Sequence, residues 1–223
     1  MIIELYDTSY IPRRVFCIGR NYRAHAEELN NAIPDSPVVF IKPTSSLIPK
    51  NSIIPMPSHG QDLHYEAELV ILVGQEGRPQ NLDDTRRFIE GFSIGLDLTL
   101  RDVQSGLKKK GLPWEKAKGF DGSAPLGTFA SFNPEIDLAD ISFTCEVNGE
   151  IRQQGNTGNM LFSIPILLME LSKIWVLKPG DLIFTGTPEG VGPLHSGDSI
   201  SVSCDLVGTY SWTVGRVSDP ACV

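Results

Sequence analysis

Proline and glycine interrupt this chain at short intervals from end to end, which limits the regular structure it can form. The 223 residues include 16 prolines and 21 glycines, spread over the whole length instead of gathered in one linker. Both residue types are typical of turns and are unfavourable inside helices and central strands. The pattern predicts one domain, residues 1–223, in which turns separate many short elements.

The apolar runs between these breaks have the length and composition of strands. Residues 15–18, 38–41, 69–73 and 92–98 are short, apolar and bounded by glycine, proline or polar residues. Residues 141–147 alternate toward Asn148-Gly149, a strong signal for a type I′ hairpin, with the return strand at 150–154. A second hairpin is expected from 198–207 and 210–217, across Gly208-Thr209.

Helical patterns are fewer. Helices are expected at 22–30, 81–90, 100–110 and 164–173. Asn81 and Asp84 provide a cap and an acidic first turn for the second of them, and Pro165 is tolerated early in the fourth. The sequence therefore predicts an α+β fold that is predominantly β, with a few peripheral helices.

Charge and cysteine content restrict the function classes. A net charge of −8 argues against a nucleic-acid or anionic-membrane partner, because both favour a basic surface. The lysine run 108–110 is expected to be a solvated helix end. No Cys-x-x-Cys pair occurs, and the chain lacks a signal peptide and an apolar run of membrane-spanning length, so free thiols and a cytoplasmic location are expected. The four cysteines are Cys17, Cys145, Cys204 and Cys222.

Two glutamates stand at the start of the apolar strand expected at 69–73. Glu66 and Glu68 are two residues apart, so their side chains share one face of an extended chain, with Cα atoms about 6–7 Å apart. Two buried like charges require a cation between them or a proton on one. A divalent cation such as Mg²⁺ is the simplest partner, although a solvent-facing pair with no ligand is the alternative.

Asp97 is a third candidate ligand, since it lies in an apolar strand pattern where a carboxylate is unusual. Its alternative role is to cap the helix that follows, a role for which Thr99 and Asp102 compete. With Glu66 and Glu68 it would complete a facial set of oxygen ligands, which leaves room for water and substrate.

His25 and Glu28 are three residues apart on a predicted helix, so they are neighbours on one face. A carboxylate beside an imidazole raises its basicity, which favours a general base that activates water. From these residues alone, an ordinary surface pair on a polar helix is the favoured alternative. Lys116 and Lys118 would point to one side of an extended segment, where either could stabilise an oxyanion or remain solvated.

The glycine-rich segment 185–192 matches neither a Walker loop nor a dinucleotide-binding motif. Its backbone N–H groups could approach an anion such as a substrate carboxylate, or it could be a simple tight turn.

Taken in order, these segments resemble the fumarylacetoacetate hydrolase family, most closely its small members of the acylpyruvate hydrolase and oxaloacetate decarboxylase group. No single block is decisive, but their joint order is specific. The matching blocks are residues 17–25, 37–43, 64–69, 95–104, 109–120, 147–153 and 185–192.

The resemblance implies a mixed β-sandwich roll, commonly a homodimer, with Mg²⁺ or Mn²⁺ as the cofactor. It implies that Glu66, Glu68 and Asp97 hold the metal, and that His25 and Glu28 form a dyad on a short helix that orders over the site. It favours Lys118 over Lys116 as the catalytic lysine. It also implies that the substrate is held by Arg101, Gln104 and Thr187.

The activity implied is a metal-dependent hydrolase that cleaves the C3–C4 bond of 3-acylpyruvates, such as fumarylpyruvate or acetylpyruvate, to pyruvate and a carboxylic acid. The same site would support decarboxylation or keto–enol tautomerisation of oxaloacetate, which is the alternative. Two interpretations of other classes remain open: a non-catalytic, metal-dependent domain that binds a small acid, and a structural dimerisation module with solvated carboxylates.

Overall fold

Two β-sheets form the framework of the protein, which the computed structural model describes over residues 1–5, 7–29 and 31–215. The eight-stranded sheet has the order β4 (Val38–Lys42), β3 (Val15–Gly19), β15 (Leu182–Phe184), β8 (Ala67–Val73), β9 (Ile89–Leu96), β11 (Ala124–Leu126) and β5 (Leu47–Pro49), with β12 (Ala130–Ser131) also paired to β9. The five-stranded sheet has the order β14 (Glu150–Asn156), β13 (Ser142–Val147), β17 (Ser199–Cys204), β18 (Gly208–Gly215) and β6 (Ile53–Pro55).

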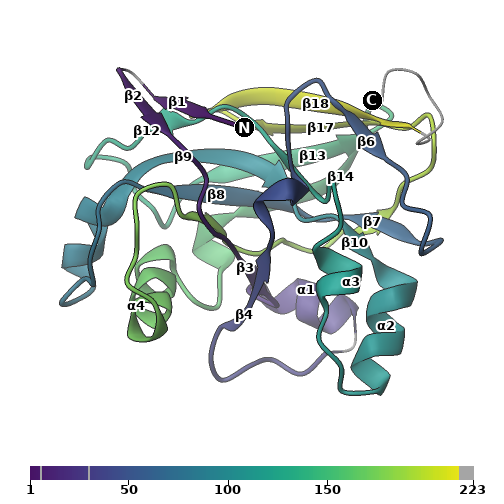
Figure 1. Ribbon diagram of the computed structural model, residues 1–223, viewed down its shortest axis with the longest axis horizontal. Helices are drawn as coiled ribbons and strands as arrows, with labels where there is room; N and C mark the ends of the chain where they lie inside the picture. Colours follow the sequence, from purple (N-terminus) through teal and green to yellow (C-terminus); the bar gives the residue numbers. More distant parts are fainter. Residues whose placement is uncertain (6, 30, 216–223) are drawn as a thin grey trace.

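Two smaller sheets and short helices complete the fold. The sheets are β10 (Thr99–Leu100), β7 (Leu63–Tyr65) and β16 (Gly192–Pro193), and the pair β1 (Ile3–Leu5) and β2 (Thr8–Tyr10). The α-helices are α1 (Arg23–Glu28), α2 (Arg101–Lys109), α3 (Glu115–Lys118) and α4 (Ile164–Ile174), and the 3₁₀ helices are η1 (Thr44–Ser46), η2 (Asp83–Phe88) and η3 (Thr157–Asn159). Figure 1 shows β17 and β18 above β8 and β9, with α1 to α4 along the opposite edge.

The larger sheet mixes strand directions. Strand β8 is antiparallel to both β9 and β15, whereas β15 is parallel to β3 and β11 is parallel to β5. The observed architecture is thus a predominantly β, mixed-sheet sandwich with peripheral helices, which confirms the fold class predicted from the sequence.

The middle of the larger sheet is buried on both faces, and this explains the continuous apolar run in β8. Leu69 and Ile71 point into the main core together with residues of the smaller sheet, while Val70 and Leu72 point into a second core on the other face. Because side chains alternate along a strand, Glu66 and Glu68 share the face of Val70 and Leu72. The carboxylates therefore lie at the end of the second core.

Most predicted strands are present, and the first hairpin is confirmed. Asn148 and Gly149 have φ angles of 54° and 80° between β13 and β14, the positive values that a type I′ turn requires. The second hairpin forms between β17 and β18, but its turn occupies residues 205–207 and not Gly208-Thr209, because both of these already belong to β18. The strand predicted at 92–98 ends at Leu96.

Three helix predictions are confirmed with small shifts, and one is wrong. Asn81 Oδ1 does accept a hydrogen bond from the backbone N–H of Asp84 at 2.9 Å, but the segment forms the 3₁₀ helix η2 instead of an α-helix. Pairing of Ile89 with Val73 in the larger sheet overrides helical propensity from residue 89 onward.

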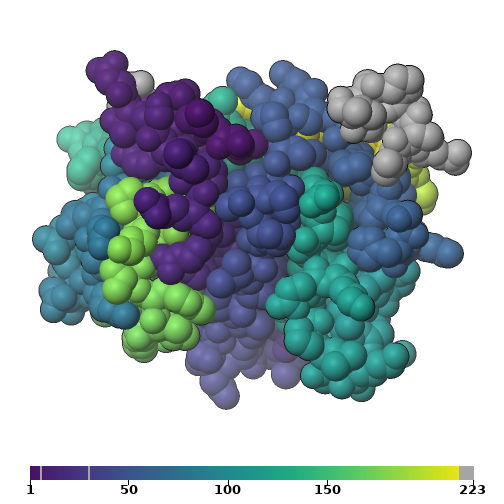
Figure 2. Space-filling model, viewed as in Figure 1, coloured from purple at the N-terminus to yellow at the C-terminus, as the bar shows by residue number. Residues whose placement is uncertain are grey.

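Cys17, Cys145 and Cys204 are free and buried. Three positions with sequence predictions lie outside the described residues. They are the end of the first predicted helix at Asn30, the end of the last predicted strand at Val217 and the expected free thiol of Cys222. Among the residues that the structure describes, no helix combines the length and apolar character needed to cross a membrane. In Figure 2 the segment that includes β4 forms a central band of the surface, between α4 on the left and α2 and α3 on the right.

Candidate metal centre and catalytic site

Three carboxylates meet at the open end of the β8–β9 pair. Glu66 immediately precedes β8, Glu68 is its second residue, and Asp97 immediately follows β9. The antiparallel register pairs Glu68 with Gly95, and the backbone N–H of Asp97 donates to the carbonyl of Glu66 at 2.8 Å. Strand pairing therefore brings Asp97 opposite the two glutamates.

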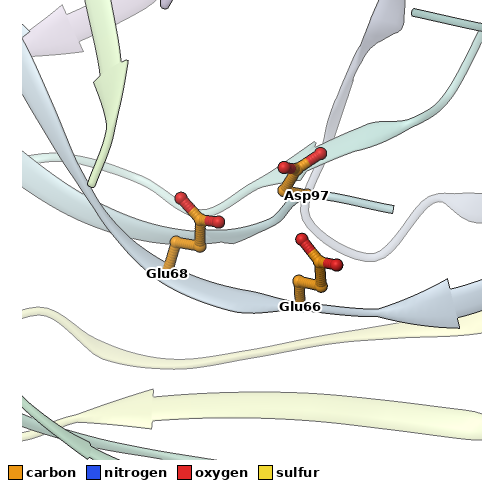
Figure 3. Close-up of side chains that lie close together, drawn as sticks. All are labelled: Glu66, Glu68 and Asp97. Atoms are coloured by element: carbon orange, nitrogen blue, oxygen red, sulfur yellow. The ribbon is translucent and has the colours of Figure 1, made fainter. Parts of the chain in front are cut away.

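The carboxylate oxygens of these residues converge on one point. One oxygen from each of Glu66, Glu68 and Asp97 lies within 4.8 Å of the others, and all three residues are at least 95% buried. Figure 3 shows Glu66 and Glu68 rising side by side from one strand, with Asp97 above Glu66 on the neighbouring segment. We refer to these three residues as the carboxylate floor. The solvent-facing alternative for the glutamate pair is wrong, because both side chains are buried.

Two cationic side chains neutralise part of this floor. Lys118 Nζ donates to Glu66 Oε2 at 2.7 Å and to Asp97 Oδ2 at 2.6 Å. Arg101 Nη2 donates to Glu66 Oε1 at 2.5 Å. Burial alone would raise the pKa of Glu66, but Lys118 and Arg101 outweigh it and hold that pKa well below its usual range.

A third cation, Lys42, contacts the floor through Asp97. Its Nζ donates to the carbonyls of Leu98 and Ser123 at 3.1 and 3.0 Å and to that of Lys118, and it lies 2.8 Å from Asp97 Oδ1. That last contact is an ion pair without hydrogen-bond geometry, so Asp97 Oδ1 keeps no hydrogen-bond donor. The sequence prediction missed Lys42, which ends β4 as an isolated lysine after an apolar strand.

Glu68 is the floor carboxylate for which the described residues provide no cationic partner. Burial and the charges of Asp97 and Glu66 raise its pKa well above the usual range, and the N–H of Gly186, 2.8 Å from Glu68 Oε2, offsets only part of this. A cluster of three buried carboxylates, one of them uncompensated, is the oxygen-ligand set that a hard divalent cation prefers. The residues present thus fit the metal that the sequence predicts.

His25 and Glu28 both lie on α1, and His25 lines a cavity that Glu66 and Glu68 also line. His25 is 95% buried, and its Nδ1 is 3.5 Å from Glu28 Oε2. Burial lowers the pKa of His25, and the charges of Arg101 and Lys118 lower it further against the opposing effect of Glu66 and Glu28. The imidazole is therefore kept neutral near pH 7, the form in which it can accept a proton.

Lys118 and Lys116 differ sharply in environment. The extended segment predicted for them is wrong: both belong to the helix α3, where residues two apart point in different directions. Lys118 is 97% buried against the carboxylate floor, whereas Lys116 is exposed and contributes only its backbone carbonyl, to His59. The structure places Lys118 at the site and Lys116 outside it.

The predicted substrate contacts, Arg101, Gln104 and Thr187, line the same cavity as His25 and the glutamates. Arg101 Nη1 donates to Gln104 Oε1 at 2.9 Å, which fixes the two side chains relative to each other. Thr187 Oγ1 accepts from Gln153 Nε2 at 2.8 Å, so its own hydroxyl proton is free to point elsewhere. Gln153 was not predicted, yet its Oε1 also accepts from the N–H of Ala67 and ties the Thr187 loop to β8.

The glycine-rich segment 185–192 does present N–H groups to anions, as the sequence suggested. The anions it contacts are carboxylates of the protein itself: Gly186 donates to Glu68, and Gly190 donates to Glu28 at 3.1 Å. The loop thereby positions one residue of the floor and one of the predicted dyad.

Two further cations, Arg20 and Lys108, line the cavity and were not predicted as site residues. The expectation of a solvated lysine run holds for the exposed Lys109 and Lys110 but is wrong for Lys108, which is half-buried. We call Arg20 and Lys108 the cationic rim, because both are more exposed than the carboxylate floor. The cavity between rim and floor holds only about 30 Å³ of free space, room for a water molecule, so a larger ligand requires side chains to shift.

Comparison with known proteins identifies the family. The model for the fumarylacetoacetate (FAA) hydrolase C-terminal domain matches residues 14–215. The oxaloacetate tautomerase of Escherichia coli is 44% identical, over 88% of this chain and 90% of that protein. The mitochondrial oxaloacetate decarboxylase of Dictyostelium discoideum is 42% identical, over 88% and 89%. A crystal structure of fumarylpyruvate hydrolase from Pseudomonas aeruginosa, in complex with Mn²⁺ and pyruvate, has a TM-score of 0.92 and 34% identity over 97% and 96%.

The chain therefore belongs to the fumarylacetoacetate hydrolase family, and it is an enzyme of that family. The resemblance inferred from the sequence is confirmed, and the two non-catalytic interpretations are wrong. The neighbour that holds Mn²⁺ and the acidic cluster found here together support a divalent metal, while the choice between Mg²⁺ and Mn²⁺ belongs to the proposal that follows.

Proposed function

We propose that this enzyme acts on oxaloacetate with Mg²⁺ or Mn²⁺ as its cofactor and interconverts the keto and enol forms. The observation that carries the proposal is that three buried carboxylates converge beside a cavity which Glu66 and Glu68 line together with His25, whose imidazole is kept neutral by burial. The oxaloacetate alternative is now favoured over acylpyruvate hydrolysis, because two relatives above 40% identity act on oxaloacetate and are matched over almost their full length.

Glu66, Glu68 and Asp97 would hold the metal ion. When bound, a divalent cation supplies Lewis-acid polarisation of the 2-oxo group, which makes the neighbouring C3–H more acidic. The remaining chemistry falls to the protein's own side chains.

In tautomerisation, His25 would take a proton from C3 of the keto form, and the C–H electron pair would move toward the 2-oxo oxygen. Glu28 keeps the imidazolium favourable once it forms, because the opposite charge lies 3.5 Å away. Lys118 would donate a hydrogen bond to the developing oxyanion. Transfer of the proton from the His25 imidazolium to that oxygen gives the enol and restores the neutral imidazole, and the reverse sequence returns the keto form. Arg101, Gln104 and Thr187 would hold the carboxylate next to the 2-oxo group.

Hydrolysis of 3-acylpyruvates is the second candidate, favoured by the likeness to fumarylpyruvate hydrolase. Here His25 would remove a proton from water, whose oxygen bonds to the acyl carbon C4. The C3–C4 bond breaks with its electron pair on the pyruvate fragment, which is then protonated at C3. Decarboxylation of oxaloacetate forms the same enolate without water.

A substrate panel tests the proposal. Oxaloacetate enol is followed by its ultraviolet absorbance, and pyruvate release is followed from oxaloacetate, acetylpyruvate and fumarylpyruvate, each with Mg²⁺, with Mn²⁺ and with excess chelator. We expect metal-dependent tautomerisation to be the fastest reaction. Faster pyruvate release from an acylpyruvate would favour the second candidate, and absence of metal-dependent turnover with all substrates would overturn both.

Three further expectations stay part of the proposal: residues 1–223 form a single catalytic domain, the protein is a homodimer, and it works in the cytoplasm. The family model covers most of the chain, which supports the first. Sedimentation equilibrium of the full chain would test the second, and a monomer at micromolar concentration would contradict it.

A further inference from the structure

The cationic rim differs from the other cations of the cavity in having no carboxylate partner. Lys42, Arg101 and Lys118 are each paired with Glu66 or Asp97. In the part of the chain that the structure describes, neither Arg20 nor Lys108 has a carboxylate oxygen within 4.0 Å, and the buried Nε of Arg20 has no hydrogen-bond partner. Glu66 and Asp97 therefore already have cationic partners within the protein, and the rim adds two positive charges that no described carboxylate pairs with.

The two rim cations line the same cavity, and each is affected by the other's charge. Burial lowers the pKa of Lys108 to about 8, and the largest contribution from a neighbouring charge is that of Arg20, followed by Arg101. Two like charges that line one partly buried cavity repel, and an anion bound between them would relieve both the repulsion and the desolvation.

Arg20 has an unfavourable backbone conformation, and the neighbours that contact Lys108 are neutral. Arg20 has a φ of 59°, a left-handed conformation that non-glycine residues rarely adopt outside functional positions. Lys108 Nζ lies 5.4 Å from the centre of the Trp114 ring and 3.3 Å from Asn31 Oδ1, neither of which carries a charge. The neutral contacts orient the ammonium group without satisfying its charge.

We propose that Arg20 and Lys108 form a subsite for the distal carboxylate of the substrate, so that the enzyme selects 2-oxo acids carrying a carboxylate at both ends. This inference rests on the proposed function, in which the floor and its neighbours take the carboxylate and 2-oxo group at the near end. The guanidinium and ammonium groups donate charge-assisted hydrogen bonds to the far end.

The test compares substrates that differ in the distal carboxylate. For Arg20→Gln and Lys108→Met, kcat/KM is measured with fumarylpyruvate and oxaloacetate, which carry two carboxylates, and with acetylpyruvate, which carries one. Loss of a charge-assisted hydrogen bond predicts a fall of about 10- to 100-fold for the dicarboxylates, mainly through KM. Turnover of acetylpyruvate should change by less than about threefold.

Equal losses on all substrates, or no loss on any substrate, would overturn the subsite. Lys109→Met and Arg23→Gln, which alter exposed cations nearby, are the matched controls.

A binding measurement separates failure of the subsite from failure of the proposed function. With Mg²⁺ present, titration calorimetry with 2-oxoglutarate and with pyruvate requires no turnover. Both variants should weaken binding of the dianion 2-oxoglutarate by about 10-fold or more and leave that of pyruvate nearly unchanged. If wild-type protein binds both equally, the subsite is wrong even when the enzyme is active; if selectivity is present but no substrate turns over, only the proposed function fails.

Discussion

The floor and the rim of the cavity carry charge in opposite ways. The carboxylate floor lies at the ends of paired strands, fully buried, with Lys42, Arg101 and Lys118 positioned against it. The cationic rim lies on a loop and on the last turn of α2, partly exposed, with no anion opposite it among the described residues. The proposed metal centre thus lies where the fold itself supplies cations for two of three carboxylates, and the proposed carboxylate subsite lies where two cations have no such partner in the described part of the chain.

Removing a floor carboxylate should have the largest effect on activity. Glu68→Ala deletes one proposed metal ligand, and since a bound metal contributes several kcal/mol to such reactions, metal-dependent kcat/KM should fall by about 10³-fold. The fold should persist, because Glu68 is a buried carboxylate without a cationic partner and its loss removes an unfavourable charge. Steady-state kinetics and circular dichroism test both halves of this prediction.

The control for this prediction is Glu150→Ala, an exposed carboxylate on β14 whose loss should leave kinetics unchanged. Wild-type activity in Glu68→Ala, or in wild-type protein with excess chelator, would contradict the metal assignment.

Removing a cation from the floor should reduce stability in addition to any loss of activity. Lys118→Met leaves Glu66 and Asp97 buried with less compensation, which should lower the free energy of unfolding by about 3–5 kcal/mol without metal, or roughly 10 °C in Tm. Mg²⁺ should recover part of this loss, since a ligand that binds only the native state stabilises it. Thermal unfolding with and without Mg²⁺ provides the measurement.

Lys116→Met is the matched variant on the same helix, and its exposed side chain predicts a change below about 0.5 kcal/mol. Similar Tm values for the two variants would show that the floor does not depend on Lys118 for charge balance.

His25 lies between floor and rim and should show an intermediate effect. Because general-base catalysis contributes about 10²- to 10⁴-fold, His25→Ala should reduce acylpyruvate hydrolysis by at least 10²-fold and decarboxylation by clearly less, since only hydrolysis needs an activated water. Parallel pyruvate-release assays on acetylpyruvate and oxaloacetate measure the ratio. Equal losses would show that water activation is not the task of His25.

The contrast between floor and rim also explains what the sequence could predict. Glu66, Glu68 and Asp97 are visible in the sequence because carboxylates are unusual in apolar strands, and the two-residue period of a strand fixes which face they share. The type I′ turn at Asn148-Gly149 was equally predictable, because its φ angles leave few residue choices.

The residues that were missed depend on contacts distant in sequence. Local sequence does not distinguish Lys108 from Lys109 and Lys110. Only the packing of α2 beside Trp114 determines which of these lysines faces the cavity. Lys42 and Gln153 act through partners more than 30 residues away, for which local sequence carries no signal. The wrong helix at 81–90 has the same origin, since sheet pairing at Ile89 overrides local preference.

The smallest predicted effect is a change in stability that distinguishes a rim variant from a floor variant. Arg20 adopts φ 59°, a conformation that glycine accepts without strain, and its charge repels Lys108. Arg20→Gly should therefore raise the free energy of unfolding by about 0.5–1 kcal/mol, or a few degrees in Tm, while it weakens turnover of dicarboxylates. Asn51→Gly, at φ 62° and outside the cavity, should give a similar or smaller gain with unchanged kinetics. A loss of stability in Arg20→Gly comparable to that of Lys118→Met would mean that the rim, like the floor, is neutralised within the protein, and the distinction between the two would no longer hold.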